Sequence, residues 1–226
     1  MVRNCLLGVL VTSIATSVFA DEKTTFDTSW LPSKPEVLTY SLSGTQGDGM
    51  LQVSSTRSSA GIEININVIS PGFSKTVFGE MDLNLKPSKS KTRMLVDGQV
   101  GMVTDCDYSL GGMHIATLMS PYNQKLERTF KSEEQIIDFS QTSLLVRTLK
   151  LIPGAEFRFT SVNPKSNTLT PLIIRVASEE TILKVPCYKI ELRDFEGRSL
   201  LWVEKGSTHR VLRTEKEDGT ITELIQ

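Results

Sequence analysis

The clearest pattern along the chain is an alternation of apolar and polar residues over positions 62–69. Ile62, Ile64, Ile66 and Val68 occupy every second position, and the residues that separate them are polar. A period of two predicts a β-strand with one buried face and one solvated face. We therefore expect residues 62–69 to form a strand whose apolar face belongs to the core or lines a ligand cavity.

Similar runs, separated by turn-forming residues, extend along most of the chain. Residues 36–43 and 49–57 precede this strand, with the glycine-rich run 44–49 between them, and Asp97-Gly98 is typical of a two-residue hairpin. The other predicted strands are 76–85, 91–97, 100–108, 113–119, 125–131, 171–178, 185–193, 199–205, 209–216 and 220–225. The regular spacing of those after residue 170 predicts an antiparallel meander.

One segment has a helical period instead. Residues 140–152 place Leu145, Leu149 and Ile152 on one helical face, Ser140 can cap the start, and Pro153-Gly154 can end the helix. A large antiparallel sheet accumulates twist and rolls up, so its concave face needs a helix or a ligand to cover it. The sequence therefore predicts a mainly β (α+β) fold with the helix packed on the sheet.

The N-terminus has the features of a secretory signal peptide. Arg3 supplies the positive charge, an apolar stretch follows from Cys5 to about Ala15, and Val18-Phe19-Ala20 offers small residues at the two positions that matter to signal peptidase. We expect cleavage after Ala20 and a periplasmic or otherwise extracytoplasmic location. The alternative, a membrane anchor, would need about 20 apolar residues, and no later segment is long enough to span a membrane either. Residues 21–35 are predicted to be an extended polar segment, and residues 36–226 a single domain.

Composition narrows the function without identifying it. The 226 residues are 39% hydrophobic with a net charge of −1, which argues against a disordered chain and against a nucleic-acid-binding surface. Removal of the predicted signal leaves Cys106 and Cys187, which can form a disulfide in an oxidising compartment. The alternative is a pair of separate buried thiols. We favour the disulfide.

No catalytic motif stands out. The nucleophile and metalloprotease patterns are absent, and Ser207-Thr208-His209 lacks the spacing of a triad. Asp105 and Asp107 flank Cys106 and are interpreted as solvent-facing charges beside a buried cysteine. The acids at positions 133, 134 and 138 are interpreted as solvated charges in a linker. We expect a protein that is not an enzyme and has no cofactor and no metal site.

The C-terminal half, from about residue 136 to 226, resembles bacterial envelope proteins of unknown function that are related in fold to the LolA/LolB lipoprotein carriers. The residues that carry the resemblance are 139–149 (FSQTSLLVRTL), which follow Asp138, and then 185–192 (VPCYKIEL), 201–204 (LWVE) and 208–213 (THRVLR). The resemblance implies a curved antiparallel half-barrel with one or a few helices on its concave face. In the carriers, that concavity accepts acyl chains.

These observations favour an exported, non-enzymatic protein that binds an apolar or lipid-like ligand in the half-barrel. The predicted lining residues are Ile62, Ile64, Ile66, Val68, Leu145, Leu149 and Trp202, for each of which plain core packing is the alternative. A second hypothesis is a cell-envelope module with a filled core that docks a protein partner. A third, an envelope hydrolase, would need a polar cleft with a perturbed carboxylate or an activated serine.

Overall fold

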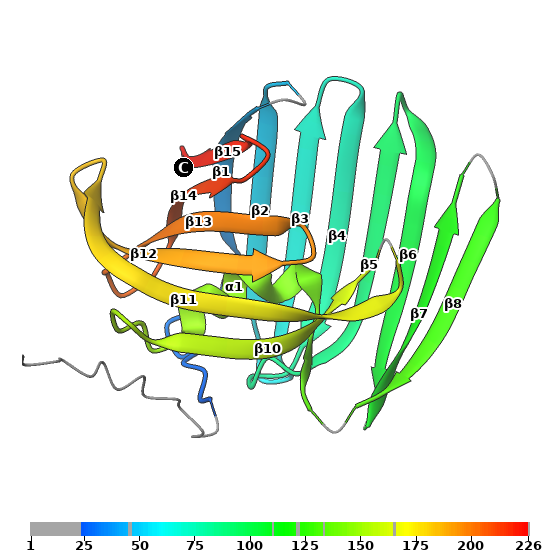
Figure 1. The fold of residues 1–226 in the computed structure, drawn as a ribbon, viewed down its shortest axis with the longest axis horizontal. Helices are drawn as coiled ribbons and strands as arrows, with labels where there is room; N and C mark the ends of the chain where they lie inside the picture. Colours follow the sequence, from blue (N-terminus) through cyan, green and yellow to red (C-terminus); the bar gives the residue numbers. More distant parts are fainter. Residues whose placement is uncertain are drawn as a thin grey trace, which may run out of the picture.

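The strands of the protein form one continuous, strongly curved sheet (Figure 1). The computed structural model describes residues 24–44, 47–109, 111–120, 123–132, 134–164 and 166–225. The predicted signal peptide, residues 1–20, lies outside these residues. Within the described part, the sheet has 15 strands in the order β8-β7-β6-β5-β4-β3-β2-β1-β15-β14-β13-β12-β11-β10-β9.

The first half of the sheet is a simple meander. Its strands are β1 (Glu36–Ser43), β2 (Gly49–Arg57), β3 (Ile62–Ser70), β4 (Phe73–Met81), β5 (Pro87–Val96), β6 (Gln99–Ser109), β7 (Gly112–Met119) and β8 (Gln124–Lys131). Most predicted strands are confirmed within a few residues. Asp97 and Gly98 form the predicted hairpin, and their φ angles of 50° and 76° are the positive values that a type I′ turn requires. The predicted strand 76–85 is displaced towards the N-terminus, because residues 82–86 form a loop that buries Leu85 in the core.

The second half begins with the helical segment and returns to the first strand. It consists of β9 (Ile136–Ile137), the 3-10 helix η1 (Phe139–Gln141), α1 (Thr142–Thr148), β10 (Glu156–Asn163), β11 (Thr168–Ile182), β12 (Val185–Asp194), β13 (Gly197–Glu204), β14 (Val211–Lys216) and β15 (Ile221–Leu224). Strand β15 pairs antiparallel with β1, which joins the halves, and β9 pairs parallel with β10. The sequence pattern did not predict β9 or β10.

The sheet rolls up so that β10–β13 lie in front of the first half, with α1 between the two layers (Figure 1). The rolled-up ends meet through side chains. Thr117 Oγ1 donates a hydrogen bond to Asn167 Oδ1 at 3.0 Å, and Asn167 Nδ2 donates to Leu126 O at 3.2 Å. This arrangement matches the predicted curved half-barrel with a helix on its concave face.

The helix is shorter than the predicted 140–152. Asp138, not Ser140, is the capping residue of η1, and α1 ends at Thr148 because Leu149 is extended (φ −77°, ψ 148°). Leu149 and Leu151 are both buried in this extended segment, whereas Ile152 is 50% exposed. Residues 149–152 therefore bury every second side chain as an extended segment, where the sequence predicted a last helical turn. No helix among the described residues is long and apolar enough to cross a membrane.

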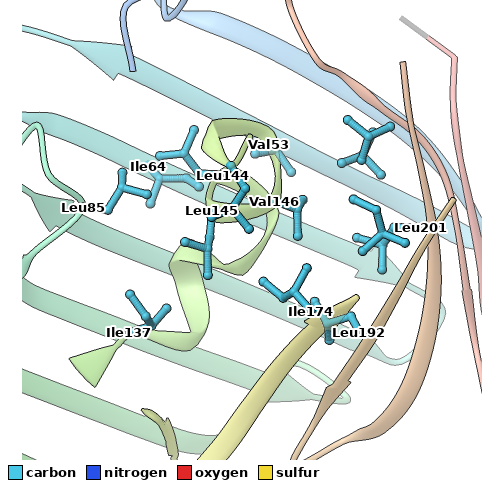
Figure 2. Close-up of a cluster of buried hydrophobic side chains, with 14 of the residues drawn as sticks. Val53, Ile64, Leu85, Ile137, Leu144, Leu145, Val146, Ile174, Leu192 and Leu201 are labelled. Carbon is cyan, nitrogen blue, oxygen red and sulfur yellow. The ribbon is translucent and has the colours of Figure 1, made fainter. Parts of the chain in front are cut away.

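Helix α1 fills the centre of the half-barrel. Leu144, Leu145 and Val146 are at most 1% exposed and belong to the main core cluster. Figure 2 shows them between residues of the two layers, namely Val53, Ile64, Ile174, Leu192 and Leu201. Complete burial of one such side chain contributes about 1.5–3 kcal/mol. The helix is therefore an integral part of the core.

The predicted disulfide is absent. Cys106 and Cys187 are both buried free thiols, and they lie in different apolar clusters. Cys106 packs with Met113 and Ile115 on the inner face of the first half, whereas Cys187 packs with Trp202. The alternative interpretation, two separate buried thiols, describes the structure. Asp105 and Asp107 are exposed on either side of Cys106, as expected.

Candidate functional site: the uncovered inner face of the half-barrel

A buried carboxylate fixes the start of the helical segment to the sheet. Asp138 is 4% exposed and accepts hydrogen bonds from Ser90 Oγ at 2.6 Å, from Ser140 N at 2.8 Å and from the hydroxyls of Tyr108 and Ser140. The Gln141 side chain accepts from Asp138 N at 2.8 Å, which completes a capping box. Asp138 is therefore not the solvated linker charge that we expected. The spacing Asp138-x-x-Gln141 was the sequence signal that could have revealed it.

A buried arginine fixes the other end of the helix. Arg147 forms a bidentate ion pair with Glu36 at 2.9 and 3.1 Å, and it donates to the carbonyl oxygens of Thr208 and His209 at 2.8 and 3.2 Å. Its guanidinium also lies 4.3 Å from the centre of the Trp30 ring. Helix α1 is thus held to β1, to the β13–β14 connection and to the N-terminal segment, and its position in the concavity is well defined.

Beyond the helix, the inner face of the first half is only partly covered. Register places one row of inward-facing residues across six strands: Leu51 of β2, Val68 of β3, Lys75 of β4, Met94 of β5, Met102 of β6 and Met119 of β7. In Figure 1 these ends of the strands extend past the β10–β13 layer. All of these residues except Met102 are partly exposed. Further towards the strand ends, Val96 is 49% exposed opposite Phe73.

Two aromatic rings border this row where it meets the helix. Phe139 of η1 and Phe195 of the β12–β13 turn have ring centres 5.1 Å apart, and both are partly exposed. The Lys75 ammonium lies 4.7 Å from the centre of the Phe139 ring. We call this region the mouth. It consists of the two bordering rings, Phe139 and Phe195, and of the inward-facing strand residues beyond the helix, which are Leu51, Val68, Phe73, Lys75, Met94, Val96, Met102 and Met119. It is an apolar surface with one cationic side chain.

The predicted lining residues divide between the core and the mouth. Ile62, Ile64, Leu145 and Leu149 are at most 2% exposed and pack in the main core cluster around the helix. Ile66 and Val68 are partly exposed, and Val68 belongs to the mouth. The alternation over 62–69 therefore forms a continuous apolar strip that begins in the core and ends at the mouth.

Trp202 lies on the opposite face of the sheet from the concavity. Its strand neighbours Leu201 and Val203 belong to the main core cluster, whereas Trp202 packs with Cys187 and Leu212 in a separate one. Its Nε1 donates to Glu180 at 2.9 Å. Trp202 is a structural residue of the outer face.

Two cavities lie at the other end of the same strands. They have volumes of about 440 and 240 Å³ and share Lys86, Pro87, Tyr108 and Ser109 in their walls. Their remaining walls include the acids Glu63, Glu80, Asp82 and Glu134. Charged walls suit a polar ligand and oppose an apolar one, because an acyl chain would desolvate them.

Burial favours the neutral forms of Cys106 and Tyr108. Burial raises the pKa of the Cys106 thiol to about 12, with a smaller contribution from the charge of Asp138. Burial also raises the pKa of Tyr108 well above its usual value. A thiol with such a pKa is a poor nucleophile. Among the described residues, no group of three or more His, Cys, Asp or Glu side chains is placed to hold a metal ion.

Comparison with known proteins identifies the fold alone. No protein-family model matches the chain, and no curated protein matches its sequence. Among solved structures, the chain is similar to a β-barrel-like protein of a domain of unknown function, DUF1849, from Brucella abortus. The TM-score is 0.57 at 11% identity, and the match covers 87% of this chain and 98% of that one. The protein thus has a β-barrel-like fold that is shared with a protein of unknown function.

Proposed function

We propose that the protein is an exported, non-enzymatic binding protein that holds an apolar or lipid-like ligand on the mouth of the half-barrel. The observation that carries this proposal is the partial exposure of apolar side chains on a concave face. Leu51, Val68 and Met94 face inward and remain partly exposed, whereas residues nearer the helix on the same strands are buried. The resemblance to lipoprotein carriers and the signal-like N-terminus support the same proposal.

The dimensions of the mouth suit one extended acyl chain. Six neighbouring strands at a spacing of about 4.8 Å give an inner row about 24 Å long. Each methylene group removed from water contributes about 0.8 kcal/mol, which is offset in part by the entropy lost on association. Methionine side chains are flexible and polarisable, so the β5–β7 part of the row can adapt to ligands of different shape.

The proposal can be tested with two neighbouring residues of β3. Val68 belongs to the mouth, whereas Ile69 is 61% exposed on the opposite face. Val68→Glu places a charge on the proposed site and should reduce uptake of a fluorescent fatty acid at least about tenfold, which corresponds to 1.4 kcal/mol. Ile69→Glu is the matched control and should leave uptake unchanged.

Native mass spectrometry of protein purified from its own envelope, followed by organic extraction, tests the ligand directly. We expect a co-purifying lipid. Absence of any lipid, combined with no fatty-acid uptake by the unsubstituted protein, would overturn the proposal.

The filled centre of the half-barrel favours a second candidate, an envelope module that docks a protein partner. On the outer face, Met50 and Ile69 lie opposite each other on β2 and β3 and are 48% and 61% exposed. If this face is the functional one, Ile69→Glu should abolish capture of the partner while Val68→Glu has no effect. The same pair of variants therefore separates the two functions.

A further inference from the structure

Met94, Met102 and Met119 lie side by side on three neighbouring strands. Met94 of β5 pairs with Met102 of β6, and Met102 pairs with Met119 of β7. Residues that are directly opposite in an antiparallel sheet project from the same face, with Cβ atoms about 4.5–5.5 Å apart. The three side chains therefore extend from adjacent points of the inner face, and the flexible methionine side chain allows their sulfur atoms to converge.

The strands beneath this row are held together by polar contacts. Thr104 and Thr117 form the next inward row between β6 and β7, and their hydroxyls are 3.1 Å apart. Thr117 also donates to Asn167 at 3.0 Å and to Pro164 O at 3.2 Å. This network fixes β6 and β7 relative to each other immediately below the methionines. Met102 in the centre is 8% exposed, while Met94 and Met119 are partly open to the mouth.

The donor set has a definite chemical preference. Thioether sulfur is a soft, uncharged ligand that selects Cu(I) among biological metal ions, whereas calcium and magnesium require oxygen ligands. The ammonium of Lys75, which lies opposite Met94, repels any cation, and it repels a monovalent ion less than a divalent one. The ligands therefore fit a soft monovalent cation better than a divalent one.

We propose that Met94, Met102 and Met119 form a thioether site for a soft monovalent metal ion, Cu(I). The ion enters from the mouth and binds the sulfur atom of each methionine, with Met102 as the central ligand. The site uses the β5–β7 part of the face that the proposed apolar ligand would cover, so the metal ion and that ligand compete.

Substitution by leucine separates this proposal from the proposed function. Leucine has nearly the volume of methionine and stays apolar, so Met94→Leu/Met102→Leu/Met119→Leu removes the thioethers and keeps the apolar face. The background for all titrations is Cys106→Ala/Cys187→Ala, because thiolates also bind soft metals. The matched control is Met50→Leu, which removes an exposed thioether from the outer face.

The experiment is a titration with Ag(I), the redox-inert analogue of Cu(I), followed by native mass spectrometry and by NMR of 13C-labelled methionine methyl groups. We expect one bound ion and shifts confined to the methyl groups of Met94, Met102 and Met119. The triple leucine variant should bind more than about tenfold more weakly, and Met50→Leu should bind normally. Circular dichroism confirms that each variant is folded.

The proposal is overturned if the triple variant binds Ag(I) as tightly as its background, or if the shifts fall on Met50, Met81 or Met113. Because fatty-acid uptake is measured on the same variants, the two proposals can fail independently. Uptake that persists without Ag(I) binding overturns the metal site alone. Ag(I) binding without fatty-acid uptake and without a co-purifying lipid overturns the apolar-ligand function alone.

Discussion

Replacement of Asp138 by alanine is a direct test of how the helical segment is held in the half-barrel. The Asp138 carboxylate is 4% exposed and accepts hydrogen bonds from Ser90, Tyr108 and Ser140. Loss of an N-cap side chain costs about 1 kcal/mol. Each buried donor left without an acceptor costs a further 1–3 kcal/mol or so. Because the hydroxyls can rotate towards other acceptors, we expect a total loss of about 4 kcal/mol in the free energy of unfolding.

The assay is urea unfolding followed by tryptophan fluorescence, with thermal unfolding in parallel. For a domain of this size, 4 kcal/mol lowers Tm by about 8–16 °C. Asp138→Asn should fall between the wild type and Asp138→Ala, since asparagine also caps helices but lacks the charge. Asp107→Ala is the control, because Asp107 lies next to Tyr108 on β6 but is exposed. This substitution should change the free energy of unfolding by less than about 0.5 kcal/mol. A loss below about 1 kcal/mol for Asp138→Ala would refute the reasoning.

Three other predictions follow from the same structure. Arg147→Ala leaves Glu36 without its buried partner and should cost about 3–5 kcal/mol in urea unfolding, whereas Arg158→Ala, which breaks an exposed pair, should cost under about 1 kcal/mol. Iodoacetamide without reductant should label Cys106 and Cys187 only after denaturation, and the predicted disulfide would instead prevent labelling. Burial raises the pKa of the Cys106 thiol to about 12, so the unfolded thiol ionises first, and the contribution of Cys106 to the free energy of unfolding should fall above pH 9 by about 1.4 kcal/mol per pH unit. Cys106→Ala should reduce the slope measured in urea titrations by that amount, while Cys187, Tyr40 and Tyr108, whose pKa values burial also raises, keep part of the slope.

Much of the sheet could be predicted because its signals are local. The alternation at Ile62–Val68 and the Asp97-Gly98 turn depend on residues next to each other in the sequence, and both predicted elements are present. Strand β10 (EFRFTSVN) was not predicted, because apolar residues do not continue along one of its faces as they do in β3. The N-terminal segment partly covers β10, and the ring centres of Phe26 and Phe159 are 6.2 Å apart.

The candidate site was harder to predict, because it depends on which parts of the concavity are covered. Ile64 and Val68 share one face of β3, yet Ile64 is buried beneath α1 and Val68 is partly exposed beyond it. Nothing in the local pattern distinguishes them. The importance of Asp138 was hidden for a related reason, because Ser90 and Tyr108 reach it from strands that are far away in the sequence.

By itself, the sequence determined the strand-rich fold, most strand boundaries and the presence of a short apolar helix, since each follows from the spacing of neighbouring residues. The tertiary structure alone decided which face each strand buries and where the helix lies. Leu200, Leu201, Trp202 and Val203 are consecutive apolar residues, so alternation could not tell which of them face the concavity. The curl of the sheet turned Leu201 and Val203 towards α1 and Trp202 away from it. Likewise, Cys106 and Cys187 remained apart because the sheet places them in separate apolar clusters, a relation that no local pattern encodes.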